Sequence, residues 1–361
     1  MKTLTLTLAA LLAAVTLSAA NPVDETALKT WATKAMQRCP SATATMDFID
    51  RPGGPSNFRT YRVVQKSSDE NCGAQSFLLF SPTTQQIFFG SVIALPDDQR
   101  ALATRLSEHA GKLLKQTITA KLSPLTLPDG VRPVALVRQT PYGPFSYNGY
   151  VDASGKFLLI GLLGNLKENP ALTLRKTLGV DSGAKRGIGV SKTEIIEISD
   201  FQCPTCARAH EALEPLVSKS LGKVSYIRLD LPLFEHHQWA MSAALGARAI
   251  QRVAPAKYWQ YVDHVFRNQE QIANLNFDKF LKDFVEDNDI QWKPVEKIYK
   301  SASERTALLD QVSRAFAAGV VSTPTIIING QRMGFGDSAF AIEAVKTALG
   351  APSGSAATTK K

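Results

Sequence analysis

The stretch TEIIEISDFQCPTCARAH, residues 193–210, decides the fold of the C-terminal half of this chain. Its apolar beginning, Thr193 to Ile198, predicts a strand, and Pro204 begins a helical pattern that continues to Leu221. Proline suits the first turn of a helix because its missing N–H would be unpaired there. The sequence CPTC therefore lies where a strand ends and a helix begins, which makes a common four-residue pattern specific.

The two cysteines of this motif occupy different positions on the predicted helix. Cys203 lies at its N-terminus, where unpaired backbone N–H groups and the positive end of the helix dipole favour thiolate over thiol. Cys206 is in register with the apolar positions Ala209 and Leu213, so it faces inward and is shielded. We therefore expect Cys203 to be the attacking sulfur and Cys206 the resolving sulfur of a redox-active pair.

The CPTC pattern is also compatible with two roles that involve no redox chemistry. The pair could form a purely structural disulfide, or it could be half of a zinc site completed by His210 or by His236 and His237. The chain has no second CxxC, and the order strand, CxxC, helix is not that of a zinc-ribbon hairpin. We expect redox chemistry with no metal and no other cofactor, and structural, capping or packing roles for these histidines.

Downstream of the motif, the pattern has the order β-α-β, several helices, then β-β-α. The sequence predicts a strand over Val224–Leu231, helical segments from Gln238 to Ala318, strands over Thr325–Ile328 and Gln331–Gly334 around the turn Asn329-Gly330, and a helix over Asp337–Leu349. Residues 350–361 cannot bury apolar surface and are expected to be a disordered tail.

From Ile195 to Leu349 the chain resembles the thioredoxin superfamily, and within it the exported DsbA-like thiol:disulfide oxidoreductases. The resemblance covers a little under half of the chain. It rests on EISDFQCPTCARAH (197–210), on the long helical stretch, and on VSTPTIIINGQR (321–332). It implies an α/β thioredoxin fold with a helical insertion.

The resemblance also implies roles for three further residues. Glu197 matches the position of the buried acidic residue that moves the proton of the inner cysteine. Thr323 and Pro324 match the family's X-cis-Pro loop, in which the proline packs beside the cysteine pair and the preceding backbone pairs with an extended substrate segment. The alternatives are a solvent-facing strand residue for Glu197 and an ordinary turn proline for Pro324.

The region before this one predicts an α+β domain. Residues 22–38 have the apolar spacing of an amphipathic helix. Two hairpins follow, one with strands at Phe77–Phe80 and Ile87–Phe89, the other with strands at Tyr147–Val151 and Phe157–Ile160. They end in Gly90 and Gly161, 71 residues apart, and charged helices over 97–115 and 170–178 follow them. This spacing indicates two related units, although hairpins of similar length also arise by chance.

The remaining cysteines, Cys39 and Cys72, lie in this N-terminal region without CxxC spacing or a helix start. We expect a structural disulfide between them. The alternative is a second redox pair that relays electrons to Cys203.

The N-terminus has the features of a cleaved secretory signal peptide. Met1-Lys2-Thr3 supplies a positive charge, Leu4 to Leu17 is apolar, and Ser18-Ala19-Ala20 is a small-residue cleavage pattern. We expect cleavage after Ala20 and a periplasmic or secreted protein. The alternatives are a buried helix and an uncleaved anchor.

Composition excludes several function classes. The chain of 361 residues is 44% hydrophobic and 20% charged, and no apolar run reaches the ~20 residues needed to cross a bilayer. The formal charge of +9 is dispersed and accompanies no nucleic-acid recognition motif, so no nucleic-acid partner is expected. At about 150 residues per domain, the length predicts two domains, each with its own core.

These observations divide the chain into five parts. They are a signal peptide (1–20), an N-terminal α+β domain (21–180), a linker (181–191) rich in glycine and without apolar periodicity, a DsbA-like thioredoxin domain (192–349), and the tail (350–361).

The expected function is disulfide formation in secreted or periplasmic proteins by dithiol–disulfide exchange at CPTC. The expected partners are unfolded or thiol-containing exported proteins and a membrane redox partner. A DsbC-like isomerase or reductase remains open, because residues 145–166 resemble strands of the N-terminal domain of such isomerases; that region is far longer here, so the oligomeric state does not follow. A third possibility is an exported binding or adaptor protein on a thioredoxin scaffold.

Overall fold

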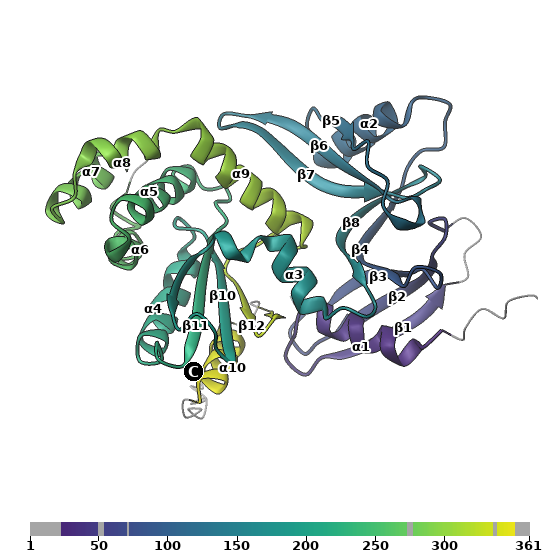
Figure 1. Ribbon diagram of the computed structural model, residues 1–361, viewed down its shortest axis with the longest axis horizontal. Coiled ribbons are helices and arrows are strands. Elements are labelled where there is room, and N and C mark those ends of the chain that lie inside the picture. Colours follow the sequence, from purple (N-terminus) through teal and green to yellow (C-terminus); the bar gives the residue numbers. More distant parts are fainter. Residues whose placement is uncertain (1–22, 50–53, 71, 273–276, 335–337, 351–361) are drawn as a thin grey trace, which may run out of the picture.

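The computed structural model (Figure 1) describes residues 23–49, 54–70, 72–272, 277–334 and 338–350. The predicted signal peptide with its cleavage site after Ala20, and the predicted tail from residue 351 onward, lie outside these residues. Among the described helices, none is both long enough and apolar enough to span a bilayer.

The N-terminal half is built on one antiparallel sheet of eight strands. Their order across the sheet is β1 (Thr43–Ile49), β2 (Arg59–Lys66), β3 (Ala74–Phe80), β4 (Gln86–Ala94), β8 (Phe157–Asn165), β7 (Gly143–Val151), β6 (Arg132–Thr140) and β5 (Thr119–Leu122). Helix α1 (Glu25–Ala35) precedes the first four strands and α2 (Leu102–Leu114) precedes the second four. Both predicted hairpins are confirmed, as β3–β4 and β7–β8.

The register of this sheet reveals two related units. Gly90 and Gly161 are direct partners at the centre of the β4–β8 pairing. In the first hairpin Phe80 pairs with Ile87, and in the second the residues 71 positions later, Val151 and Leu158, pair with each other. A local two-fold axis between the two glycines therefore relates the inner strands, and the 71-residue interval in the sequence is its signature.

The C-terminal half has the predicted thioredoxin architecture. Its five-stranded sheet has the order β13 (Gln331–Met333), β12 (Thr325–Ile328), β10 (Thr193–Ser199), β11 (Val224–Asp230) and β9 (Ala184–Gly187), with β10 and β11 parallel. Apolar residues of α4 (Pro204–Ser218) and α10 (Ser338–Leu349) pack on one face of the sheet. Between β11 and β12 the chain inserts α5 (Ala240–Val253), α6 (Tyr258–Arg267), α7 (Phe277–Asp287), α8 (Trp292–Tyr299) and α9 (Ala302–Ala317).

The predicted linker, residues 181–191, differs from the expectation. Its residues Ala184–Gly187 form the edge strand β9, which pairs antiparallel with β11. An edge strand tolerates charged residues such as Lys185, which is exposed here, so polarity and glycine content resembled those of a linker. Gly187 adopts φ +87°, and a Cβ there would lie 2.1 Å from the Val224 carbonyl oxygen. The glycine is required for this close approach rather than for flexibility.

The two halves share a large part of their core, and each also buries a smaller cluster of its own. Figure 1 shows α9 and α3 (Pro170–Leu178) between the two sheets. Strand β7 packs on α9, and the ring of Phe145 lies edge-on to Phe316 and Phe234 at 5.9 and 5.8 Å. One hydrophobic cluster includes Phe89 of the first sheet and Phe201 beside the CPTC motif. Each half has a cluster of its own, as expected, but the two are not independent, because apolar faces of both halves are also buried against each other.

We predict that Gly90→Ala will destabilise the protein by about 1 to 3 kcal/mol, because overpacking typically costs this much. A Cβ at residue 90 would lie 2.3 Å from the Ile160 carbonyl oxygen and 2.8 Å from the Cα of Gly161. The measurement is the free energy of unfolding in urea. Gly189→Ala is the control, since nothing lies within 4 Å of a Cβ there. Equal stability of the two variants would contradict the close approach of β4 and β8.

Candidate active site

The CPTC motif lies where the sequence predicted it, at the junction of β10 and α4. Cys203 is the N-cap residue with extended backbone angles, and Pro204 occupies the first helical position. The Cys203 carbonyl accepts the N–H groups of Cys206 and Ala207 at 3.0 and 3.2 Å, which begins the helix. Both cysteines of the motif are free thiols in this structure.

Cys203 is arranged to ionise. Hydrogen bonds from the Cys206 thiol, and then from the backbone N–H groups of Cys206 and Thr205, lower the pKa of Cys203 to about 6, although burial opposes this. Cys203 is buried but not completely, since 8% of the residue is exposed to solvent. A large fraction of this sulfur is therefore thiolate at neutral pH, the form that attacks disulfides.

Cys206 has the opposite environment. The residue is fully buried, and burial together with hydrogen bonding to Cys203 raises its pKa well above the ordinary value. The backbone N–H of Asp200 points at its Sγ from 3.5 Å. The two sulfurs of one motif thus differ in ionisation and in access.

The X-Pro loop lies directly against the motif. The Thr323–Pro324 peptide bond is cis, and Pro324 is buried. The Sγ of Cys203 lies 3.6 Å from the carbonyl oxygen of Thr323. The structure therefore brings Cys203, Cys206, Thr323 and Pro324 together across about 120 residues of chain.

Glu197 is completely buried in the middle of β10, so the solvent-facing alternative for it is wrong. It accepts hydrogen bonds from the Tyr226 hydroxyl and from Nη1 of Arg228, the latter at 3.1 Å. Burial opposes ionisation of Glu197, but the charge of Arg228, followed by the charge of His210 and the hydrogen bond from Tyr226, outweighs it and lowers the pKa of the carboxyl. Glu197 is therefore a buried, ion-paired carboxylate.

Two residues that the sequence did not assign to the site lie beside the cysteines. Asp200 is almost fully buried, and its Oδ2 lies 2.7 Å from Nδ1 of His237. The hydrogen bond to Asp200 and the charge of Cys203 raise the pKa of His237, although burial opposes this. The sequence does show an acidic residue, Asp200, three positions before Cys203. It does not reveal the contact with His237, because that residue is 37 positions away in the chain.

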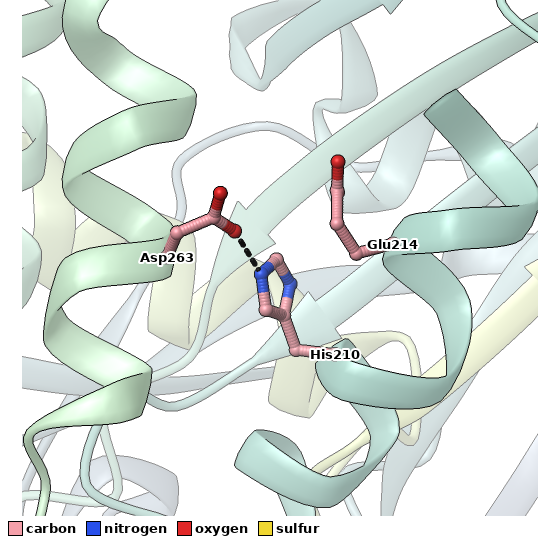
Figure 2. Close-up of side chains that lie close together, drawn as sticks. All are labelled: His210, Glu214 and Asp263. Atoms are coloured by element: carbon pink, nitrogen blue, oxygen red, sulfur yellow. Dashed lines mark hydrogen bonds and ion pairs between the residues drawn. The ribbon is translucent and has the colours of Figure 1, made fainter. Parts of the chain in front are cut away.

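The histidine nearest the motif in sequence, His210, belongs to a separate cluster (Figure 2). Its Nε2 lies 2.6 Å from Oδ1 of Asp263, and Glu214 follows one helical turn later. Ligand atoms of these three residues lie within 4.8 Å of one another, the one such group of three or more in the described part of the chain, and it contains neither cysteine. Arg186 bonds both carboxylate oxygens of Glu214. The cluster is better explained as an ion-pair network between α4, α6 and β9 than as a metal site.

The N-terminal cysteines are joined to each other. Cys39 and Cys72 form a disulfide, and both are buried, with 4% and 1% exposure. The bond lies at the junction of the two halves, since a Cβ on Gly334, just after β13, would be 2.1 Å from Cys72 Sγ. Burial closes these sulfurs to an attacking thiolate, so their position favours a structural role over an electron relay.

Comparison with known proteins gives a family model that matches the C-terminal part of the chain and several distant relatives. A family model described as thioredoxin matches residues 182–350. The chain is 24% identical over 193 residues to the Na(+)/H(+) antiporter NhaA 1 of Salinispora arenicola, a match that covers 50% of this chain and 28% of that protein. It is 25% identical over 147 residues to NhaA 3 of Salinispora tropica, covering 41% and 22%. The chain thus spans less than a third of the length of these curated relatives.

The chain is also similar to solved structures, among them those of two bacterial proteins. MdbA, a thiol-disulfide oxidoreductase from Corynebacterium diphtheriae, is 19% identical with a TM-score of 0.39, and the match covers 46% of this chain and 90% of MdbA. Oxidised BdbD from Bacillus subtilis is 20% identical with a TM-score of 0.40, covering 47% and 95%.

We predict that the reduced protein gains stability relative to the oxidised protein as pH rises from about 6 to 8. The pKa of Cys203 is about 6 in the folded protein and about 8.5 in an unfolded chain. The Cys203 thiolate therefore stabilises the folded dithiol form, fully above pH about 8.5, and this stabilisation is lost as pH falls through about 6. The disulfide form has no such titration. Urea unfolding of both forms at several pH values measures the difference. A difference independent of pH, or one retained in reduced Cys203→Ser, would contradict the assignment.

We also predict that Cys39→Ala/Cys72→Ala lowers the free energy of unfolding by about 3 to 4 kcal/mol in the chain-entropy model, without changing the pKa of Cys203. Urea unfolding and alkylation of Cys203 at graded pH measure the two quantities. A large change in the reactivity of Cys203 with little loss of stability would instead indicate a relay.

Proposed function

We propose that the protein is an exported thiol:disulfide oxidoreductase of the DsbA type, which forms disulfides in other exported proteins, on the premise that a family model described as thioredoxin matches its residues 182–350. The observation that carries the proposal is the unequal pair of sulfurs at the start of α4. Cys203 has a pKa of about 6 and borders the surface, whereas Cys206 is fully buried with its pKa raised. A structural disulfide requires no such difference between its sulfurs.

The reaction proceeds by two exchanges from the disulfide form. A substrate thiolate attacks Sγ of Cys203, the Cys203–Cys206 bond breaks, and the sulfur of Cys206 leaves with the electron pair and takes up a proton. A second substrate thiolate then attacks the substrate sulfur of the mixed disulfide, and Cys203 leaves as a thiolate. The substrate has lost two electrons and formed one disulfide, and the enzyme holds the two electrons as a dithiol.

The properties of Cys203 favour this direction of electron flow. A sulfur that is stable as a thiolate is a good leaving group and stabilises the dithiol form, which makes the disulfide form a stronger oxidant. The Thr323 carbonyl lies 3.6 Å from Sγ of Cys203, and this supports our assignment of the Thr323 backbone as the group that pairs with an extended substrate segment. Recognition through backbone groups suits an enzyme that acts on many unfolded substrates.

Export and reoxidation complete the proposal. The predicted signal peptide with cleavage after Ala20 would direct the chain to a compartment where disulfides persist. A catalytic cycle then requires an acceptor for the two electrons left on Cys203 and Cys206. We assign that role to a membrane redox partner.

The test uses the mature chain, residues 21–361, equilibrated in glutathione buffers. We predict that its disulfide form oxidises a reduced protein substrate in stoichiometric amount and that Cys203→Ser abolishes this. We also predict that reduced Cys206→Ser accumulates a mixed disulfide with a disulfide-containing substrate, because no Cys206 thiol is present to displace that substrate from Cys203. Non-reducing electrophoresis and thiol titration measure all three.

A parallel assay with a scrambled substrate separates the rival functions. Oxidation without repair of the scrambled protein supports the oxidase. Efficient repair by the dithiol form would replace it with an isomerase, and failure of both reactions with intact cysteines would favour a binding or adaptor protein.

A further inference from the structure

The segment that follows β11 is fastened at two points to the turn that precedes the reactive cysteine. The backbone N–H of Leu233 donates to Oδ2 of Asp200 at 2.7 Å, and that of Trp239 donates to Oε1 of Gln202 at 2.6 Å. His237 lies between these two anchors. The position of His237 is therefore set by Asp200 and Gln202, which lie just before Cys203 in the chain.

The protonation of the His237 ring follows from its partner. The carboxylate of Asp200 is almost fully buried and already accepts the backbone N–H groups of Gln202 and Leu233, so it acts as an ionised acceptor. The ring nitrogen 2.7 Å from it, Nδ1, must then be the donor. This leaves Nε2 as the nitrogen that gains or loses a proton, on a side chain that is 21% exposed.

Asp200 connects this imidazole to both sulfurs. Its carbonyl accepts the N–H of Cys203 at 3.2 Å, and its own N–H points at Sγ of Cys206 from 3.5 Å. Asp200 and Cys203 are the groups whose charges act on His237 in the described structure. Because the interaction between two charges is mutual, a protonated His237 must favour the thiolate of Cys203 as much as that thiolate favours the imidazolium.

The CPTC motif has no cation of its own, since Thr205 is neutral. We propose that His237, oriented by Asp200, supplies the positive charge that the motif lacks and stabilises Cys203 as the leaving thiolate in disulfide exchange. This deepens the proposed function and rests on it for its role in catalysis. His237 acts on Cys203 through charge, as a positioning and electrostatic residue, and forms no bond to substrate.

The decisive variants are His237→Asn and His237→Lys. Asparagine keeps an N–H donor where Nδ1 lies and removes the charge, whereas lysine keeps a charge and loses the ring. We expect His237→Asn to raise the pKa of Cys203 by about one unit, a tenfold change typical of losing a nearby opposite charge. The equilibrium with glutathione should shift about tenfold toward the disulfide form, equivalent to about 30 mV. We expect His237→Lys to recover most of both shifts, and His236→Asn, at the exposed neighbouring position, to change neither.

Thiolate absorbance near 240 nm against pH, and glutathione equilibration, measure these quantities without a substrate assay. They can therefore succeed or fail independently of the proposed oxidase activity. Unchanged values in His237→Asn, or equal shifts in the asparagine and lysine variants, would overturn the inference, the second because it would indicate a structural role.

A measurement that leaves residue 237 intact covers the case in which the variants do not fold. Nuclear magnetic resonance titration of the wild-type imidazole should give a higher pKa for His237 in the dithiol form than in the disulfide form or in Cys203→Ser. Equal values in the three proteins would overturn the inference as well.

Discussion

The buried carboxylate of Asp200 is the constraint on which the active site depends. It closes the turn between β10 and α4 by accepting the N–H of Gln202, and it holds the segment after β11 through the N–H of Leu233. A buried carboxylate is costly unless its lone pairs are satisfied, and here three donors, the third on His237, satisfy them. One side chain thereby fixes the helix start, the approach of the neighbouring segment and the electrostatic surroundings of Cys203.

A second buried charge, Glu197, lies deeper in the same sheet and has a different partner. The resemblance to DsbA-like enzymes implies that Glu197 moves the proton of Cys206. In this structure Arg228, itself fully buried, holds Glu197 as a carboxylate with a lowered pKa. A paired carboxylate of this kind is a weak base, whereas the thiol of Cys206 is a weak acid. At neutral pH this carboxylate holds no proton that it could give to Cys206 as that sulfur leaves, and it is a poor base toward the Cys206 thiol. The ion pair with Arg228 therefore disfavours the proton-transfer role that the resemblance implies.

The sequence predicted what depends on local pattern. The strand before CPTC, the helix that begins at Pro204, both N-terminal hairpins and the Asn329-Gly330 turn follow from residues that are neighbours in the chain, and the structure has all of them. The interval between Gly90 and Gly161 also predicted a repeat, because a two-fold axis in a sheet leaves a constant offset in sequence. None of these signals depends on which elements pack against each other.

The features that the sequence did not reveal depend instead on contacts between distant residues. The Asp200–His237 hydrogen bond joins positions 37 residues apart. The shared core was missed for a similar reason. The apolar face of α9 predicts that this face is buried, but it does not reveal which half of the chain covers it.

The junction between the halves also limits where a substrate can add to the thioredoxin sheet. The segment around Arg38 forms a parallel bridge with Met333 at the β13 edge, through hydrogen bonds of 2.7 Å from Arg38 N–H to Arg332 and from Gly334 N–H to Arg38. The adjacent Cys39–Cys72 disulfide holds this segment in place. An extended peptide cannot pair with that stretch of edge, because its backbone groups already have partners. The backbone of Thr323 lies next to Cys203, so under the proposed function the N-terminal half would leave strand addition to the position beside that sulfur.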